Sequence, residues 1–451
     1  MSTTVQPSRT GARTGVLRRR GFGARATTEP ITEIWRSSPG AIWRAFLRQS
    51  PSFWFLCLYL IIEYVRPQQI YPWFNFMPWG KVSLIGTIVL FFIEGRLPVA
   101  RSPANWLMLA YTAVVVASSF MGVSPSVSWD KFYEWYYWLI IYFLIINLID
   151  TEEKFFLFLL VYFVTNLKMS QSGFRSWAMD GFHFRDWGIA GAPGWFANSG
   201  ELGVEMCVFF PMSLYCFLAL WKRMKRPVAL IYLFMPVSAA LVILGTSSRG
   251  AQLGMAASII WMLLKSKYKF RALISAAVFV PLLYFMLPES QLTRFRDAGD
   301  DETSVARLTL WRHGREITKE NPVLGIGYGT WLVYYKANYD PKGQLPHNIF
   351  IQNSAELGFS GFAVLLGLIL MTFFLNHQTR ALARRFGDRG ILYERMGHGL
   401  DAALIGFMVS GFFVTVLYYP FMWINLAFTV SLNLVTKKFV ATVTAPSQPC
   451  R

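Results

Sequence analysis

A histidine stands where a long polar segment, residues 288–348, gives way to an apolar run. His347 is followed by mostly apolar residues as far as about Leu375. Pro346 suits the entry to a helix, and Asn348 can cap one. Histidine titrates near pH 6.5, so a neutral imidazole can accept a proton from a hydroxyl group. His347 is therefore a candidate general base; the alternative is a histidine that caps the helix or lies at the lipid interface.

Two arginines are candidates for holding an anion near this histidine. Arg249 lies in a Ser-Ser-Arg-Gly corner between two apolar runs, and an arginine at the centre of a membrane helix costs about 2.5–3.5 kcal/mol. A guanidinium binds phosphate through two parallel donors. Arg307, Trp311 and Arg315 fall on one face of a predicted helix, and two cations flanking an indole suit a phosphate or a sugar. The alternatives are an arginine that reaches lipid headgroups and an ordinary amphipathic surface helix.

Acidic side chains inside membrane spans are functional candidates by default. Glu205 lies within an apolar run, shortly after Asn198 and the small residues that follow it. We therefore expect Asn198 and Glu205 to support the same cavity. The glycine-rich run 321–329 lacks the Lys-Ser/Thr of a phosphate loop, so it predicts a tight turn shaped for close packing rather than a nucleotide site. The four cysteines show no metal-type spacing, and we expect neither a metal site nor a cofactor.

The composition indicates a membrane protein. Of the 451 residues, 54% are hydrophobic and 15% are charged, whereas soluble proteins carry about 25% charged residues. The net charge of +18 is spread over short basic segments between apolar runs, as in loops on the cytoplasmic side of a membrane. No soluble basic domain is left to bind nucleic acid. The predicted class is an all-α polytopic membrane protein, with membrane lipid as a partner.

About twelve transmembrane helices are predicted from runs of roughly 20 apolar residues. Placing the nine-arginine N-terminal arm in the cytoplasm puts most basic loops on that side and both termini inside. Residues 288–348 hold eight basic and eight acidic residues, which suits a large external loop containing short helices. The predicted regions are a partly disordered basic arm (1–52), spans one to nine (53–287), the external loop (288–348), spans ten to twelve (349–438) and a cytoplasmic tail (439–451). The last two spans are expected at 401–418 and 420–436.

The chain resembles the O-antigen ligase and O-antigen polymerase superfamily. His347-Asn348, nine residues, then Gly358, two residues and Gly361 match the ligase pattern. The Ser-Ser-Arg-Gly corner at 247–250 and the runs 196–202 and 307–327 look like the same family. The resemblance implies twelve spans, a large periplasmic loop, an undecaprenyl-diphosphate glycan donor and an inverting transfer without a metal. It further implies that Arg249 and Arg307 hold the diphosphate and that His347 activates the acceptor hydroxyl. Asn348, Arg315, Trp311, Asn198 and Glu205 are the expected supporting residues.

These observations predict a glycosyltransferase of the bacterial inner membrane whose active site faces the periplasm. The acceptor is left open between lipid A core sugar, a growing polysaccharide and a protein hydroxyl, the last being protein O-oligosaccharyltransferase activity. The alternative from another class is a transporter of lipid-linked glycans. A transporter is expected to carry its essential charges at mid-membrane, whereas the candidates here cluster at the external edge.

Overall fold

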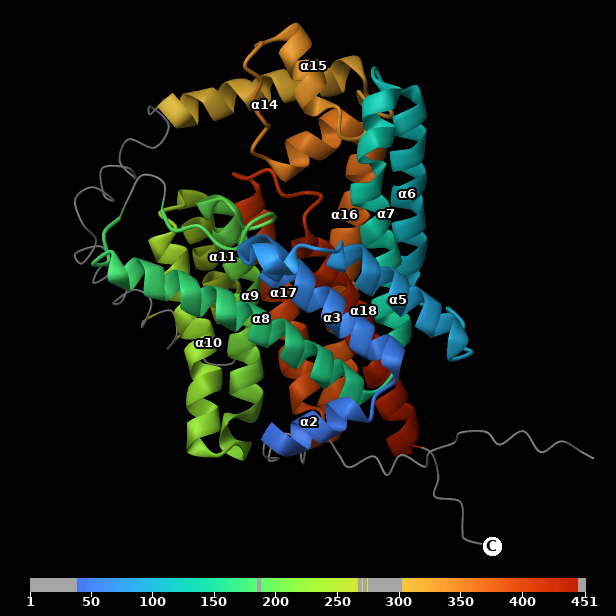
Figure 1. The fold of residues 1–451 in the computed structure, drawn as a ribbon, viewed down its shortest axis with the longest axis vertical. Helices are drawn as coiled ribbons and strands as arrows, with labels where there is room; N and C mark the ends of the chain where they lie inside the picture. The colour runs from blue at the N-terminus through green and yellow to red at the C-terminus, as the bar shows by residue number, and fades with distance from the viewer. Residues whose placement is uncertain (1–38, 185–187, 267–269, 271–273, 275–301, 445–451) are drawn as a thin grey trace, which may run out of the picture.

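The regular structure of the chain is helical in the computed structural model, which describes residues 39–184, 188–266, 270, 274 and 302–444. No strand occurs in these ranges, and the predicted all-α membrane class is confirmed (Figure 1). Several long helices begin at proline, whose fixed φ suits the first turn. In chain order the helices are α2 (Pro39–Leu47), α3 (Pro51–Val65), α4 (Pro67–Ile70), η1 (Pro72–Phe74), α5 (Trp79–Ile93), α6 (Pro103–Met121), α7 (Pro125–Leu148), α8 (Glu152–Met179), α9 (Ser199–Leu220), η2 (Trp221–Arg223), α10 (Arg226–Gly245), α11 (Arg249–Lys265), α14 (Glu302–Glu320), α15 (Trp331–Asn338), α16 (Ile349–Ala383), η3 (Arg384–Arg389), α17 (Ile391–Gly411) and α18 (Pro420–Thr444).

Within the described ranges, seven helices have the length and apolar composition to cross a membrane. An eighth results if α2 and α3, which meet at a bend of 119°, form one span. The predicted spans at α3, α7 and α11 are helical, as is the part of the span 401–418 that lies in α17, but these four helices are not among the seven. Most of the predicted span 271–287, the arm 1–38, residues 288–301 and the tail 445–451 lie outside the described residues. The total of twelve spans therefore stays a prediction.

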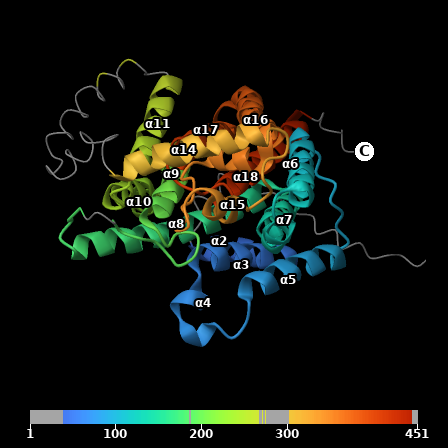
Figure 2. The ribbon, with the colours of Figure 1, turned by 90° about the horizontal axis from the view of Figure 1, so that it is seen from above.

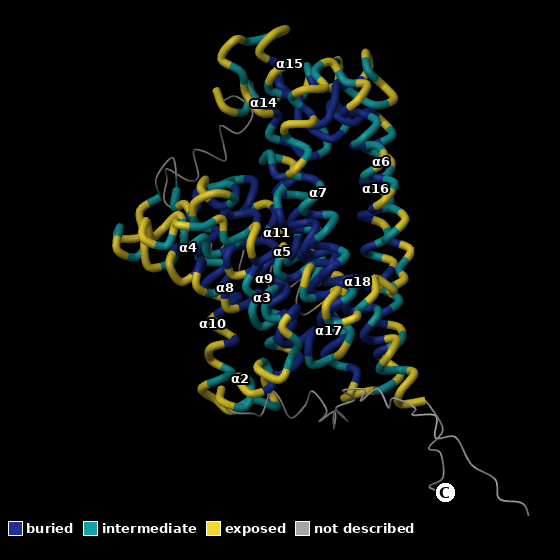
Figure 3. The backbone as a smooth tube through the Cα atoms, turned by 45° about the vertical axis from the view of Figure 1, so that its right-hand side comes forward, coloured by how far each residue is buried: buried dark blue, intermediate teal, exposed yellow. Residues whose placement is uncertain are grey.

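The core of the bundle is built around α9, which packs against α10, α11 and α17. Most residues of α9 are buried. Figure 3 shows the buried positions in the centre of the bundle and exposed positions on its outside, for example at α4. Apolar side chains that face lipid on the outer helices and side chains packed inside are both hydrophobic. For this reason sequence hydropathy predicts these helices but does not predict which of them lie at the centre of the bundle.

A cap of α14, α15 and the first turns of α16 covers one end of the bundle (Figures 1 and 2). It has a small apolar core of its own, separate from the core of the bundle and formed by Leu310, Ile317, Ile326, Trp331, Tyr335 and Ala355. Gly314 lets α14 approach closely, because a Cβ there would lie 2.3 Å from Ile351 Cγ2. The predicted helix around residues 305–317 is thus present as α14, and the described part of the polar loop does contain short helices.

The helix α16 is broken at Gly358, where the predicted span 349–375 was continuous. Gly358 has φ 66° and ψ −168°, and a Cβ there would lie 2.4 Å from the backbone of Val323. The chain around the break pairs with the glycine-rich run 321–329. The Ile326 N–H donates to the Ala355 carbonyl and the Phe359 N–H to the Pro322 carbonyl, at 2.9 and 2.7 Å. The glycine-rich run is therefore a close-packing turn against the kink, and it ties the cap to α16.

The last loop between helices also differs from prediction. The expected span 401–418 is occupied by the end of α17, which starts at Ile391 and stops at Gly411, and by an irregular loop, Phe412–Tyr419. Pro420 then opens α18. The loop lies between the cap and the bundle in Figure 1, where it is drawn in red. The helix α2 and the end of α18 lie at the opposite end of the bundle from the cap.

Candidate functional site

His347 precedes Asn348, the N-cap of α16, and has a left-handed backbone conformation with φ 47°. Such a conformation costs about 1–2 kcal/mol for a residue with a side chain. The backbone N–H of His347 donates to the Thr415 hydroxyl at 2.9 Å. Asn348 caps α16, because its side-chain oxygen accepts from the N–H groups of Phe350 and Ile351 at 2.9 and 3.1 Å. The capping role predicted for Asn348 is confirmed, and it fixes the direction in which the chain leaves His347.

Trp311 of α14 lies against the same segment. Its indole N–H donates to the Pro346 carbonyl at 3.0 Å, and its ring packs edge-to-face on Phe412 with centroids 5.0 Å apart. The His347 side chain is half-buried beneath this cover. Burial, and after it the charge of Arg307, lowers the pKa of His347 from 6.5 to about 4. At neutral pH the imidazole is therefore uncharged and free to accept a proton.

Arg249 is the first residue of α11, and the corner before it is strained. Ser247 has φ 52°, and its buried hydroxyl has no hydrogen-bond partner within the described part of the chain. Ser248 is the N-cap of α11. An Arg249 guanidinium nitrogen donates to the Thr303 hydroxyl in the first turn of α14, at 3.2 Å. The structure thus joins the arginine corner to the helix that carries Arg307. Of the four non-glycine residues with positive φ in the described ranges, two, Ser247 and His347, lie in these two motifs.

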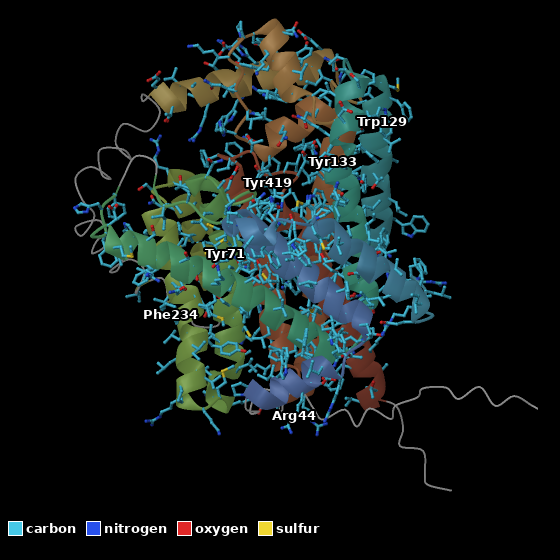
Figure 4. All side chains as sticks on the ribbon, in the orientation of Figure 1. Arg44, Tyr71, Trp129, Tyr133, Phe234 and Tyr419 are labelled. Atoms are coloured by element: carbon cyan, nitrogen blue, oxygen red, sulfur yellow. The ribbon has the colours of Figure 1, made fainter. Side chains whose placement is uncertain are left out.

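The loop Phe412–Tyr419 contacts each part of this arrangement. Its Phe413 side chain packs closely against Gly250. A Cβ added to Gly250 would lie 2.8 Å from the Phe413 Cβ. The Tyr418 hydroxyl donates to the buried carboxylate of Glu356 at 2.7 Å. The Tyr419 hydroxyl donates to Glu201 at 2.9 Å. Figure 4 shows Tyr419 between the cap and the bundle. The loop therefore connects the arginine corner, the histidine and the base of the cap.

Glu356 connects the cap to the bundle. One of its carboxylate oxygens accepts from the Trp331 N–H at the start of α15, at 3.2 Å, and the other from Tyr418. The carboxyl group lies at the N-terminus of α15, where it satisfies a backbone N–H that has no partner within the helix. The Glu356 backbone carbonyl accepts from the Ser118 hydroxyl of α6 at 2.8 Å. One residue thus joins α6, α15 and the loop.

Three predicted supporting residues are not brought to His347 by any hydrogen bond within the described ranges. Glu205 is fully buried in the bundle core, where it accepts from the Tyr162 hydroxyl at 2.7 Å. Asn198 is the N-cap of α9, and its backbone N–H donates to the Glu201 carboxylate at 3.2 Å. Arg315 is exposed on α14. The expectation that Glu205 shares a cavity with the histidine receives no support from these contacts, because Glu205 faces α8.

Sequence reasoning missed Thr415, Tyr418, Tyr419 and the roles of Glu201 and Glu356. The two glutamates stand within the quoted motifs, but nothing near them in sequence indicates their partners. The loop residues Phe412–Tyr419 carry no charge and are mostly aromatic or aliphatic, so hydropathy merges them with the adjacent span. The available signal was Pro420, because proline is common at the first position of a helix.

Two cavities lie beside the site rather than at the histidine. One has a volume of about 440 Å³ and is lined by Ser176, Asp180, His183 and Gly245, among others. The other has about 210 Å³ and lies between the end of α3 and α8. Gly245 precedes Arg249 by four residues, so the larger cavity adjoins the end of the site where Arg249 lies. Within the described ranges, no group of three or more His, Cys, Asp or Glu residues is arranged to hold a metal ion.

Residues 231–366 match the sequence model of the O-antigen ligase family. The predicted resemblance to the O-antigen ligase superfamily is confirmed for this region. The O-antigen ligase region includes Arg249, Arg307, Trp311, His347 and Gly358, whereas the loop Phe412–Tyr419 lies beyond it. The chain is also similar to the exopolysaccharide production protein ExoQ of Rhizobium meliloti (strain 1021), with 31% identity over 97 residues. That match covers 19% of this chain and 22% of the length of ExoQ.

These similarities agree with the architecture. The helices give the chain the character of a multi-pass membrane protein, and residues 231–366 are similar to the O-antigen ligase family. Within the described ranges, the O-antigen ligase region contributes the arginine corner, α14, the histidine and the kink at Gly358.

Proposed function

We propose that the protein is a metal-independent, inverting glycosyltransferase that moves a glycan from undecaprenyl diphosphate to an acceptor hydroxyl. One observation carries the proposal. His347 is uncharged at neutral pH and is close enough to Arg307 for that charge to lower its pKa. Arg307 lies on α14, and Arg249 donates a hydrogen bond to the first turn of the same helix. A proton acceptor and two guanidinium groups are the components that transfer from a diphosphate requires. We place the reaction at the periplasmic face of the bacterial inner membrane, with both termini in the cytoplasm.

The chemistry assigns each group one task. The imidazole of His347 takes the proton of the acceptor hydroxyl as its oxygen attacks the anomeric carbon of the donor sugar. The bond from that carbon to the diphosphate oxygen breaks on the opposite face, which inverts the configuration. Arg249 and Arg307 offset the negative charge that develops on the leaving undecaprenyl diphosphate. The proton on His347 is then released to water, and its low pKa favours this release.

The two similarities favour different acceptors. Similarity to an exopolysaccharide production protein favours a growing polysaccharide, whereas the O-antigen ligase region favours lipid A core sugar. Purified protein in lipid nanodiscs would be given lipid-linked glycan with each acceptor in turn. Transfer to one acceptor alone assigns the activity as polymerase or ligase. Transfer to a serine- or threonine-containing peptide instead would assign a protein O-oligosaccharyltransferase.

Replacing the base tests the enzyme class. His347→Ala is expected to lower the rate of transfer about 10²–10⁴-fold, the usual contribution of a positioned base. His377→Ala is the matched control, because His377 is an exposed histidine at the far end of α16. An undiminished rate in His347→Ala would refute the catalytic assignment. Movement of lipid-linked glycan across vesicles with no transfer to any acceptor would identify the transporter alternative.

Donor binding tests the two arginines separately from catalysis. Arg249→Gln and Arg307→Gln are expected to weaken binding of undecaprenyl diphosphate, each by about 1.5–3 kcal/mol, since hydrogen bonds to charged groups are worth this much. Arg315→Gln removes an exposed charge from the same helix as Arg307 and serves as the control. Equal affinity in all three variants would rule out a diphosphate clamp formed by Arg249 and Arg307.

The orientation has its own test. A reporter fused near Gly343, in the cap, is expected to be active only if the cap is periplasmic. A fusion after Thr444 is expected to report the cytoplasm. A cytoplasmic signal from the Gly343 fusion would invert the topology and exclude a periplasmic acceptor.

A further inference from the structure

We propose that the loop Phe412–Tyr419 is a clamp that holds His347 at a fixed position relative to the arginine corner. Thr415 is the positioning residue within this loop. This inference rests on the proposed function, because it assigns Thr415 a role in a reaction at His347. The loop lies outside the O-antigen ligase region, which ends at residue 366. The clamp is therefore a contribution of the C-terminal helices to the site.

The first observation is the backbone of His347. A φ of 47° is rare for histidine, and it persists only where neighbouring groups hold it. Two bonds flank it in the structure. The Thr415 hydroxyl accepts from the His347 N–H at 2.9 Å, and the Trp311 indole donates to the Pro346 carbonyl at 3.0 Å. Removing the Thr415 oxygen leaves the strained residue held from one side only.

The second observation is that the same loop fixes the arginine corner. Phe413 fills the space that the absent side chain of Gly250 leaves beside Arg249. Val414, the next residue, packs near Gly200 at the start of α9, where an added Cβ would lie 3.4 Å from Val414 Cγ2. Three consecutive residues, Phe413 to Thr415, therefore contact the arginine corner, α9 and the histidine. Their spacing along the chain sets the spacing of these parts.

The third observation is that the loop is anchored independently of His347. Its far end is held by the bonds from Tyr418 to Glu356 and from Tyr419 to Glu201. The Trp138 indole of α7 also donates to the Tyr418 carbonyl, at 2.8 Å. The near end of the loop continues from α17, which ends at Gly411, so Thr415 lies between a helix and a hydrogen-bonded anchor. Thr415 thus acts on His347 from a rigid support, which is the condition for a positioning residue.

The pH dependence of the rate distinguishes positioning from a general structural role. The charged group that acts on the imidazole is Arg307 of α14, and the loop itself carries no charged side chain. Its phenols, Tyr418 and Tyr419, are bonded to Glu356 and Glu201. The burial of the imidazole and the effect of the Arg307 charge on its pKa both depend on the position of the ring. If the ring is released, the pKa of His347 rises from about 4 toward its ordinary 6.5.

The experiment compares three variants of the full-length protein in nanodiscs. Thr415→Val keeps the shape of the side chain and removes the acceptor, whereas Thr415→Ser keeps the acceptor. Thr429→Val is the matched control, because the Thr429 hydroxyl is buried in α18 without a hydrogen-bond partner in the described ranges. We expect Thr415→Val to lower kcat on the order of tenfold, the effect of one lost hydrogen bond, with the KM for donor unchanged. The acidic limb of its kcat–pH profile is expected to move to higher pH, and Thr415→Ser is expected to restore both.

Each other outcome overturns one assignment. A wild-type profile in Thr415→Val, or an equal loss in Thr415→Ser, refutes positioning by Thr415. A lower rate with an unmoved acidic limb assigns Thr415 a structural role and likewise refutes the inference. If Thr415→Val does not fold, Thr415→Ala and the serine variant are compared in its place. Full activity of His347→Ala would instead overturn the proposed function, whatever the Thr415 variants do.

Discussion

Removing the charge of Arg307 gives a direct measure of the electrostatics at His347. The pKa of His347 falls from 6.5 to about 4, and Arg307 is the smaller of the two causes, after burial. Arg307→Gln is therefore expected to raise the pKa of His347 by no more than about half of that difference. The sign follows from charge, since a cation nearby disfavours the protonated imidazole and its removal favours it.

The assay is a pH titration of histidine ring signals by NMR in protein labelled at histidine. The chain has five histidines, so a His347→Gln spectrum identifies the resonance of interest. Arg315→Gln is the control, because it removes an exposed arginine from the same helix two turns away. The expected order is a low pKa in the wild type and in Arg315→Gln, and a higher pKa in Arg307→Gln. A wild-type His347 that titrates near 6.5, or equal shifts in both variants, would refute the assigned burial and the assigned partner.

The same electrostatics bears on catalysis. An anionic diphosphate bound at Arg307 would offset the charge that lowers the pKa of His347. Donor binding is then expected to make the imidazole a stronger base at the moment when the acceptor needs one. The acidic limb of kcat, which reports the donor complex, should accordingly lie at higher pH than the limb of kcat/KM, which reports the free enzyme.

Three further predictions concern the support of the site. Glu356→Ala leaves the Tyr418 hydroxyl and a backbone N–H of α15 unpaired, and thermal unfolding should show a loss of about 2–4 kcal/mol, with a smaller loss in Glu356→Gln. Gly358→Ala forces a side chain into positive φ and into the backbone of the glycine-rich run, so it should destabilise the cap by more than about 1–2 kcal/mol in the same measurement. Gly367→Ala, where the added Cβ has room, should be tolerated. Trp311→Phe keeps an aromatic ring at this position but removes the indole N–H, and kcat should fall severalfold with donor binding intact. An unchanged kcat would show that this hydrogen bond does not position the site.

The features that the sequence determined are those carried by neighbouring residues. Asn348 caps α16 through hydrogen bonds to residues two and three positions away. Pro346 and Asn348 therefore predict the start of that helix from the sequence. The helix around Trp311 follows from periodicity, and the membrane class follows from the frequency of apolar runs. The spacing from His347 to Gly358 also has a local cause, since His347 precedes the N-cap of the first segment of α16 and Gly358 ends that segment.

Only the tertiary structure decided which distant groups meet. The bond from His347 to Thr415 joins residues 68 apart, and the bond from Tyr419 to Glu201 joins residues 218 apart. No periodicity records such pairs, and an uncharged aromatic loop such as Phe412–Tyr419 has the hydropathy of the span beside it. The low pKa of His347 has the same origin, because burial and the field of Arg307 arise only when α14 is folded over the chain that precedes α16. The sequence thus determined the residue types of the site, and packing decided their charge state and their support.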